Sequence, residues 1–419
     1  MVYIDCTSTH AINMLTGIQR VVFNVIDQMQ SDPEIKKNIQ PIILSNHGFV
    51  AIEGLIPHQY THQSDKQEIQ HPSLSPKTLE TFKLFLRKFP IVYQVAKKAF
   101  FVFKRFSIAR QITKQKINFT RNDTVLFLDA TWSIPIWEEI QRAKKSQAKI
   151  IFVIYDLIPI RFSHFCDSAH REEFITFFKR TLDYADGYLG ISQTVMNDVK
   201  DYVSTIEHTR SNDINYDYFY LGADFSTNTD KMHNGIRQEI VDFFNDDTPI
   251  FLTVSTIEPR KNHALILDAF NHLWDSKQNI KLCFIGKVGW KIQKFISQIR
   301  AHPMNGTQFL VIHDANDAEL KYAYQHARGL IFASLAEGFG LPIIEAANYH
   351  LPVLASDIPI HKEIGRQEID YFESNNVKAL ISKIREMANK PKKTVQFSWL
   401  TWEQSAHMLW NKISNKDLI

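Results

Sequence analysis

Two glutamates, Glu337 and Glu345, stand on either side of a turn rich in glycine in the stretch SLAEGFGLPIIEA. The apolar run GLIFAS that precedes them predicts a buried strand. Pro342 favours the start of a helix, and Gly338 and Gly340 let the connecting backbone turn sharply and approach a ligand closely. A helix N-terminus offers unpaired N–H groups to an anion. The pattern therefore predicts an anion cradle that is bracketed by two carboxylates.

Each glutamate taken alone has an ordinary structural explanation. Glu345 falls in the expected first turn of the helix, where a carboxylate complements the helix dipole, and Glu337 would be a solvated loop acid. Both acids together, in a strand, glycine turn and helix setting, favour ligand binding instead. Glu345 can then reach past the phosphates and accept hydrogen bonds from sugar hydroxyls.

Arg260 and Lys261 form a second group that could do chemistry, in the stretch FLTVSTIEPRKNHALILDAF. They follow one apolar run and precede a helical pattern, so they lie at a βα turn. Such turns lie at the carboxyl edge of a parallel sheet, where these folds bind ligands. Two adjacent cations there can neutralise a diphosphate, although an exposed Arg-Lys pair is more commonly a solvated face.

The elements that must position these residues come in two series of apolar runs with helical stretches between them, a pattern typical of parallel α/β sheets. In the first half the runs lie at 1–5, 41–45, 124–130, 149–160 and 187–192. In the second half they lie at 249–255, 280–286, 309–314, 329–334 and 351–356. A chain of 419 residues suits two domains. We therefore predict an α/β protein with two Rossmann-like, doubly wound domains.

Four stretches carry a family resemblance: EGFGLPIIEA, STIEPRKN, CFIGKVGW and AELKYAYQHARGLIFASLAEGFGLP. Over residues 249–365 the chain resembles the donor domain of family 4 of the retaining nucleotide-sugar glycosyltransferases. That resemblance implies the GT-B fold, in which two Rossmann-like domains face each other across a cleft. We expect an acceptor-binding domain at 1–225, a donor-binding domain at 226–395, and a terminal helix at 396–419 that packs back on the first domain.

The resemblance also implies roles for individual residues. Glu337 would contact hydroxyls of the transferred sugar and Glu345 the ribose of the nucleotide, while Arg260 and Lys261 would stabilise the departing diphosphate. The residues whose backbone faces the sugar and phosphates would be Gly338, Phe339, Gly340 and Leu341. The donor-binding set is completed by Gly286 and by Asp314, which we expect beside the nucleotide base.

The first half resembles the family through TGIQRVVFNVI and FVIYDLIPIRFSHF. Gly17 in the first stretch would approach the donor phosphates, although it could also be an ordinary helix-leading glycine. In the second stretch many relatives read His-Asp-Leu-Ile-Pro, and this chain has Tyr155 in place of the histidine. Tyr155 could offer its hydroxyl or its backbone carbonyl to the donor. The retained Asp156 is expected in the catalytic set.

These observations predict transfer of a hexose, with retention, from a nucleoside-diphosphate sugar to a glycan or lipid-linked oligosaccharide in capsule or O-antigen synthesis. GDP-mannose is the expected donor, and no further cofactor is expected. No metal is expected either, because the Arg-Lys pair compensates the charge of the diphosphate. One alternative is a non-catalytic nucleotide-sugar-binding scaffold, and another is an epimerase with the same fold. The presence of all four charged residues, Glu337, Glu345, Arg260 and Lys261, favours the transferase.

The remaining sequence features concern location. Cys6, Cys166 and Cys283 lack the spacing of a zinc site or a disulfide framework, which fits a reducing cytoplasm. No secretory signal and no run of 18 apolar residues is visible. Segment 77–121 carries a net charge of +11 and the rest −8, and its interleaved aromatic residues suggest peripheral contact with the anionic inner face of the cell membrane. A pair of solvated helices is the alternative, and the absence of a nucleic-acid motif argues against nucleic acid as a partner.

Overall fold

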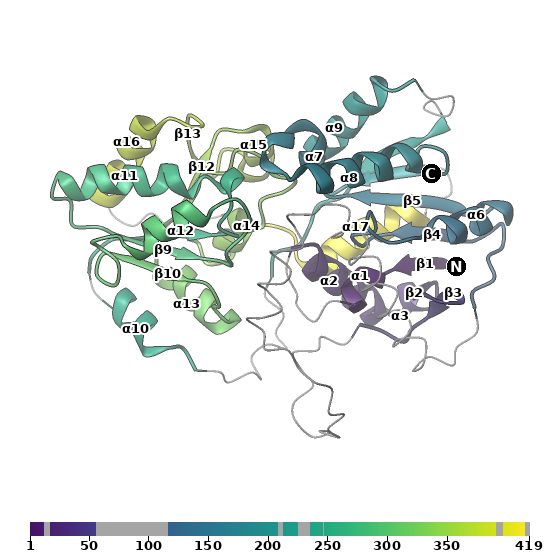
Figure 1. Ribbon diagram of the computed structural model, residues 1–419. Coiled ribbons are helices and arrows are strands. Elements are labelled where there is room, and N and C mark those ends of the chain that lie inside the picture. Colours follow the sequence, from purple (N-terminus) through teal and green to yellow (C-terminus); the bar gives the residue numbers. More distant parts are fainter. Residues whose placement is uncertain are drawn as a thin grey trace, which may run out of the picture.

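The computed structural model describes residues 1–11, 17–55, 116–207, 213–224, 235–245, 247–390 and 397–414. Two α/β units, each built on a largely parallel sheet, lie next to each other (Figure 1). The predicted fold class, two Rossmann-like domains in series, is confirmed. Most of the basic segment, residues 77–115, lies outside the described residues. Within them, no helix has both the length and the apolar character needed to cross a membrane.

The first sheet has the strand order β3-β2-β1-β4-β5-β6-β7. Its strands are β1 Val2–Asp5, β2 Ile39–Ser45, β3 Gly48–Ala51, β4 Thr124–Phe127, β5 Lys149–Ile154, β6 Gly187–Gly190 and β7 Asn215–Tyr218. All pairings are parallel except the β2–β3 hairpin. The helices associated with it are α1 Thr7–Ala11, α2 Ile18–Ser31, α3 Pro33–Lys36, α6 Trp137–Lys145, α7 Ile158–Arg161, α8 Ser168–Thr181 and α9 Gln193–Ser204.

The second sheet has the order β10-β9-β8-β11-β12-β13, and its pairings are parallel. Its strands are β8 Ile250–Val254, β9 Lys281–Ile285, β10 Phe309–Ile312, β11 Gly329–Phe332, β12 Val353–Ser356 and β13 Asp370–Phe372. The accompanying helices are α10 Gln238–Phe244, α11 His263–Asp275, α12 Gln293–Arg300, α13 Asp317–His326, α14 Leu341–Asn348, α15 Pro359–Gly365 and α16 Val377–Asn389.

Each sheet changes the direction of its strand order once, and that point is where ligands bind in open α/β sheets. In the second sheet the chain proceeds from β8 to β9 on one side, and later places β11 on the other side of β8. In the first sheet the strands on either side of β1 are β2 and β4. The loops that follow β1, β4, β8 and β11 are therefore the ones placed to build a site.

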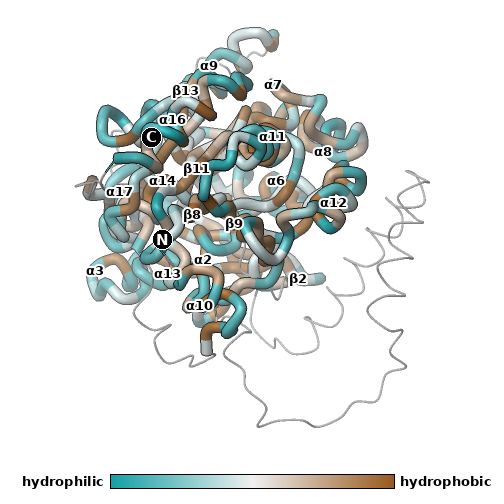
Figure 2. The backbone as a smooth tube through the Cα atoms, turned by 90° about the vertical axis from the view of Figure 1, so that its left-hand side faces the viewer, coloured by the Kyte–Doolittle hydropathy of each residue, from teal (hydrophilic) through white to brown (hydrophobic). Residues whose placement is uncertain are grey.

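The strands read as nearly continuous apolar runs because helices cover both faces of each parallel sheet. In Figure 2 hydrophobic and hydrophilic stretches alternate along outer helices such as α12 and α16, as expected of helices that bury one face. The strands β3, β7 and β13 were not anticipated from the sequence. β13 has only three residues, too short for a recognisable pattern.

The last helix, α17 Trp402–Ser414, lies against α2 of the first unit (Figure 1). His407 Nε2 lies 2.8 Å from Asp32 Oδ2, and Trp402 and Leu409 are buried. A Cβ built on Gly222 would lie 2.4 Å from the backbone nitrogen of Trp402. The chain thus returns to the first unit through a backbone contact that only glycine permits.

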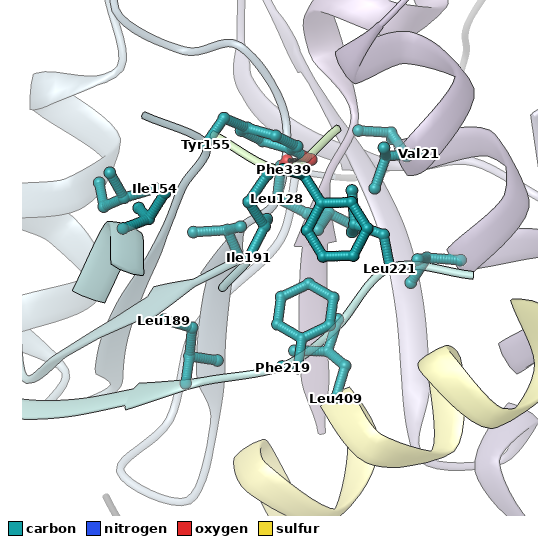
Figure 3. Packing of buried hydrophobic residues seen from close by; sticks show 14 of the residues in the cluster. Val21, Leu128, Ile154, Tyr155, Leu189, Ile191, Phe219, Leu221, Phe339 and Leu409 are labelled. Carbon is teal, nitrogen blue, oxygen red and sulfur yellow. Dashed lines mark hydrogen bonds between the residues drawn. The ribbon is translucent and has the colours of Figure 1, made fainter. Parts of the chain in front are cut away.

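A hydrophobic cluster joins the two units. Phe339, from the loop before α14, is buried among residues of the first unit that include Leu128, Ile191 and Leu221 (Figure 3). Its ring centroid lies 6.0 Å from that of Trp399, in an edge-on arrangement. The two units are therefore held together by apolar burial close to the turn that carries Glu337.

Two buried carboxylates lie at the ends of neighbouring strands, Asp5 as the last residue of β1 and Asp129 two residues after β4. Asp129 accepts hydrogen bonds from the backbone N–H of Thr9 at 2.6 Å and from its hydroxyl at 3.0 Å. Burial and the nearby Asp129 raise the pKa of Asp5 to about 7, and burial raises that of Asp129 to about 6. Protonation of either carboxyl therefore favours the folded state.

Asp5→Asn should flatten the pH dependence of stability. The raised pKa of Asp5 gives a stabilisation that is fully present below the ordinary value of 3.8 and is lost as the pH rises through about 7. Between pH 5 and pH 8 the wild type should lose roughly 2–3 kcal/mol of unfolding free energy relative to the variant. Urea unfolding at both pH values measures this difference. Glu34→Gln, at an exposed site, serves as control, and parallel profiles of wild type and Asp5→Asn would contradict the assignment.

Candidate functional site

Arg260 and Lys261 lie on a 3₁₀ turn, Pro259–Lys261, between β8 and α11. The turn ends at Asn262, whose left-handed backbone (φ 57°) redirects the chain into α11. The backbone carbonyl of Arg260 accepts a hydrogen bond from the N–H of Leu335 at 2.8 Å, which ties this turn to the loop after β11. Both side chains are largely buried, with 18% of Arg260 and 10% of Lys261 exposed.

The carboxylate of Glu337 lies between these two cations. Arg260 Nη1 donates to Glu337 Oε2 at 2.9 Å and to the carbonyl of Ala336 at 2.9 Å, and Lys261 Nζ donates to Glu337 Oε1. Burial alone would raise the pKa of Glu337, but Arg260 and Lys261 outweigh it and hold that pKa well below its usual range. Glu337 is therefore an ionised, buried carboxylate and not a solvated loop acid.

Two further acids lie next to Arg260. Glu258 Oε1 lies 2.7 Å from Arg260 Nε, and Asp156 of the first unit is close enough for Arg260 to attract it. Burial raises the pKa of both carboxyls against that attraction. If all five groups are ionised, the three acids outnumber the two cations. Protonation of either Glu258 or Asp156 would make the cluster neutral.

Glu345 lies on α14, but it is not in the first turn as the sequence predicted. The helix begins at Leu341, one residue before the expected Pro342, and has no acid in its first turn. The backbone of Gly340 at the N-cap is left-handed, with φ 111°, which glycine adopts without strain. Leu341 opens the helix, so its backbone N–H is among those left without an intrahelical partner.

The Glu345 carboxylate is held from both units. Arg20 Nη1 of α2 donates to Glu345 Oε1 at 2.8 Å, and the Tyr324 hydroxyl of α13 donates to Oε2 at 2.8 Å. Gly17, with φ 53°, is the N-cap of α2, and no neighbour lies within 4 Å of a Cβ built there. Gly17 thus caps the helix whose third residue, Arg20, reaches Glu345.

Gly338 contacts the first unit. A Cβ built on it would lie 1.9 Å from the backbone oxygen of Tyr155, and Ser192 Oγ donates to the carbonyl of Gly338 at 3.0 Å. The Tyr155 hydroxyl donates to the carbonyl of Leu128 at 2.7 Å. The hydroxyl of Tyr155 is thus used inside its own unit, and its carbonyl is the group that faces the turn. The Phe339 side chain is part of the packing between the units, which leaves only its backbone to meet a ligand.

The remaining predicted residues lie at the carboxyl edge of the second sheet. Gly286 follows β9, and a Cβ on it would lie 1.9 Å from the backbone oxygen of Ser255, so it permits close packing beside β8. Asp314 follows β10 and forms an ion pair with Arg237 at 2.9 Å, with 78% of its side chain exposed. Within the described residues, no group of three His, Cys, Asp or Glu side chains is arranged to hold a metal ion.

A cavity of about 510 Å³ opens beside the cation cluster. Arg260 and Trp290 of the second unit line it together with first-unit residues that include Trp132, Asp156 and His170. Trp290 Nε1 donates to the carbonyl of Phe165 at 2.8 Å, so the loop between β9 and α12 also joins the units. The cavity combines aromatic faces with a few polar groups, as small-molecule sites do.

Several residues of this arrangement were missed from the sequence. The sequence assigned no role to Arg20, Tyr324, Ser192 or Glu258, because each acquires its partner only through folding. A weak signal existed for Arg20, a cation three residues after a loop glycine at the start of an amphipathic helix. Glu258 could have been noted as the acid two residues before Arg260.

Comparisons with known proteins find similar sequences. Residues 237–398 match the family model "Glycosyl transferases group 1". The chain is 31% identical over 305 residues to a serotype-specific mannosyltransferase WbdA of Escherichia coli, which covers 70% of this chain and 37% of the relative. It is 28% identical over 150 residues to the O-antigen chain mannosyltransferase RfbU of Salmonella typhimurium, covering 35% and 41% respectively. The chain thus spans well under half the length of these relatives.

Solved structures show the same fold. A sucrose-phosphate synthase from Thermosynechococcus elongatus aligns with a TM-score of 0.57 at 15% identity, over 99% of this chain and 96% of that one. A glycosyltransferase from Rickettsia africae aligns with a TM-score of 0.51 at 16% identity, over 98% and 93%. Residues 237–398 therefore match a group 1 glycosyl transferase domain, and the chain that carries them has the GT-B fold.

Proposed function

We propose that the chain transfers a hexose from a nucleoside-diphosphate sugar to a hydroxyl of a glycan, with retention at the anomeric carbon. The observation that carries this proposal is the buried cluster of Glu337 with Arg260 and Lys261, which lies where the loops after β8 and β11 meet. A fixed pair of cations stabilises the charge that develops on a departing diphosphate. With that compensation supplied by side chains, the proposed reaction uses no metal and no cofactor besides the donor.

Glu337 and Glu345 are assigned to the two ends of the donor. Glu337, beside the cations, is placed for hydroxyls of the transferred sugar. Glu345 lies eight residues further along the chain, with Tyr324 and Arg20 bonded to its carboxylate, and is assigned to the ribose. The N–H groups at the start of α14 lie between these two acids in sequence and suit the phosphates.

The acceptor is assigned to the cavity beside Arg260. Trp132 offers an aromatic face for the apolar side of a sugar ring, and Asp156, His170 and Glu173 offer polar partners for its hydroxyls. The similarity to O-antigen mannosyltransferases supports a GDP-mannose donor and a glycan or lipid-linked acceptor in O-antigen or capsule assembly. We place the reaction in the cytoplasm, at the inner face of the cell membrane.

Nuclear magnetic resonance of the reaction products tests this proposal. Incubation with GDP-mannose and a mannose-terminated oligosaccharide should give a new α-linked residue, because retention keeps the anomeric configuration of the donor. Parallel incubations with UDP-glucose and UDP-N-acetylglucosamine compare other donors. A free epimerised sugar nucleotide would indicate an epimerase, and tight nucleotide binding without any new product would indicate a scaffold.

Removal of either cation should reduce turnover strongly. Arg260→Ala and Lys261→Ala should each lower kcat by on the order of a hundredfold or more, as for loss of an electrostatic stabiliser of the transition state. Steady-state kinetics with saturating donor measures the effect. Lys144→Gln breaks a first-unit ion pair of 2.7 Å outside the site and should leave kcat unchanged.

Loss of one cation also leaves the buried Glu337 carboxylate less compensated, which destabilises the fold. The variant Lys261→Ala/Glu337→Gln removes both charges and should recover thermal stability without recovering turnover. A folded Arg260→Ala/Lys261→Ala protein with the turnover of wild type would contradict the assignment.

A further inference from the structure

We propose that Arg20 of the first unit is a positioning residue of the donor site, which orients the Glu345 carboxylate to accept hydrogen bonds from ribose hydroxyls. The inference rests on the proposed function, in which Glu345 binds the ribose. It adds that the nucleotide end of the donor site is completed by the unit assigned to the acceptor. The family match begins at residue 237, and although Arg20 stands in the stretch TGIQRVVFNVI, the sequence assigned it no role.

The geometry places Arg20 directly on the carboxylate. Arg20 lies in the first turn of α2, three residues after the N-cap Gly17. Its Nη1 lies 2.8 Å from Glu345 Oε1, although 325 residues separate the two in sequence. The contact is sheltered, with 27% of the Arg20 side chain and 5% of the Glu345 side chain exposed. An ion pair in this setting is weakly screened by solvent and holds its geometry better than a surface pair.

The second oxygen of the carboxylate is fixed as well. Tyr324 donates its hydroxyl to Glu345 Oε2 at 2.8 Å, and its ring is stacked on Tyr349 with 5.6 Å between centroids. A carboxylate has about four lone-pair positions, so these two partners leave about two for a ligand. Two acceptor positions in a fixed plane suit the adjacent 2′ and 3′ hydroxyls of a ribose.

Electrostatics keep Arg20 in its charged form. Burial alone would lower the pKa of its guanidinium, but the attraction of Glu345, with a further contribution from Asp317, raises it. The ion pair therefore persists over the working pH range and does not act as a pH switch. Arg20 can compensate the buried Glu345 charge in the absence of a ligand, and the ligand need not displace it.

A purely structural link between the units and a positioning role predict different results. A structural link would affect the melting temperature without affecting selectivity for the sugar of the nucleotide. A positioning role acts through Glu345 on the ribose, so its loss should affect a nucleotide with a 2′ hydroxyl more than one without it. Discrimination between ribose and 2′-deoxyribose is therefore the decisive measurement.

The experiment is a double-mutant cycle with wild type, Arg20→Gln, Glu345→Gln and the double variant, all as the full chain. Calorimetry measures the affinity of each protein for GDP and 2′-deoxy-GDP, and for UDP and 2′-deoxy-UDP. Wild type should prefer the ribonucleotide of the pair it binds by about tenfold or more, the value of a hydrogen bond to a charged group. Arg20→Gln should bind the ribonucleotide roughly tenfold more weakly and lose most of the preference. In the Glu345→Gln background the Arg20 change should have no further effect.

Lys412→Gln is the matched control, because the Lys412–Asp217 ion pair also has a cation that is 27% exposed but joins α17 to β7 within the first unit. Lys412→Gln should leave the affinities for the ribonucleotide and for its 2′-deoxy form unchanged. The positioning role would be overturned if Arg20→Gln lowered nucleotide affinity equally in the wild-type and Glu345→Gln backgrounds, or if it left the ribose preference unchanged. In either case, nucleotide binding by the wild type would still support the proposed function. A folded wild type that binds neither GDP nor UDP would overturn both.

Discussion

The burial of two neighbouring cations, Arg260 and Lys261, is the constraint on which the rest of the site depends. Adjacent positive charges with little solvent around them repel each other and pay a high desolvation cost unless an acid lies between them. Glu337 supplies that acid from a loop 76 residues further along the chain. The arrangement requires β8 and β11 to be neighbours with the same direction, because only then do the two loops emerge at one edge of the sheet.

The same loop has to meet the first unit, and glycine makes that possible. Gly338 lets the backbone after Glu337 approach Tyr155 so closely that any side chain would collide with the carbonyl. Phe339 then buries its ring among residues of both units. These contacts fix the position of Glu337 relative to Asp156 and to the cavity. The ion pair of Arg20 with Glu345 joins the units a second time, at the other end of the same loop and helix. Charge and apolar packing thus act together on one stretch of about ten residues.

Much of this could be predicted from the sequence, because the decisive patterns are local. Apolar runs separated by helical stretches identified ten of the strands, and the Gly-Pro turn located Glu337 and Glu345. Two features were harder to predict because they depend on local detail. Helix α14 begins one residue earlier than expected, so Glu345 lies beyond its first turn. Strand β13 is too short to recognise. The contacts between units could not be predicted, since nothing local indicates that Arg20 reaches Glu345 or that the Tyr155 carbonyl faces Gly338. The predicted role of the basic segment 77–121 stays a prediction, because most of it lies outside the described residues.

The central claim is that Glu337 serves the sugar end of the donor and Glu345 the nucleotide end. Calorimetric titration of GDP and UDP into Glu337→Gln and Glu345→Gln, beside their steady-state rates, tests it most directly. Glu345→Gln should bind the nucleoside diphosphate about tenfold or more weakly, because that contact exists before and during the reaction. Glu337→Gln should keep nucleotide affinity near that of wild type, since Arg260 and Lys261 remain, while its turnover falls. Equal losses of nucleotide affinity in both variants would contradict the division of roles.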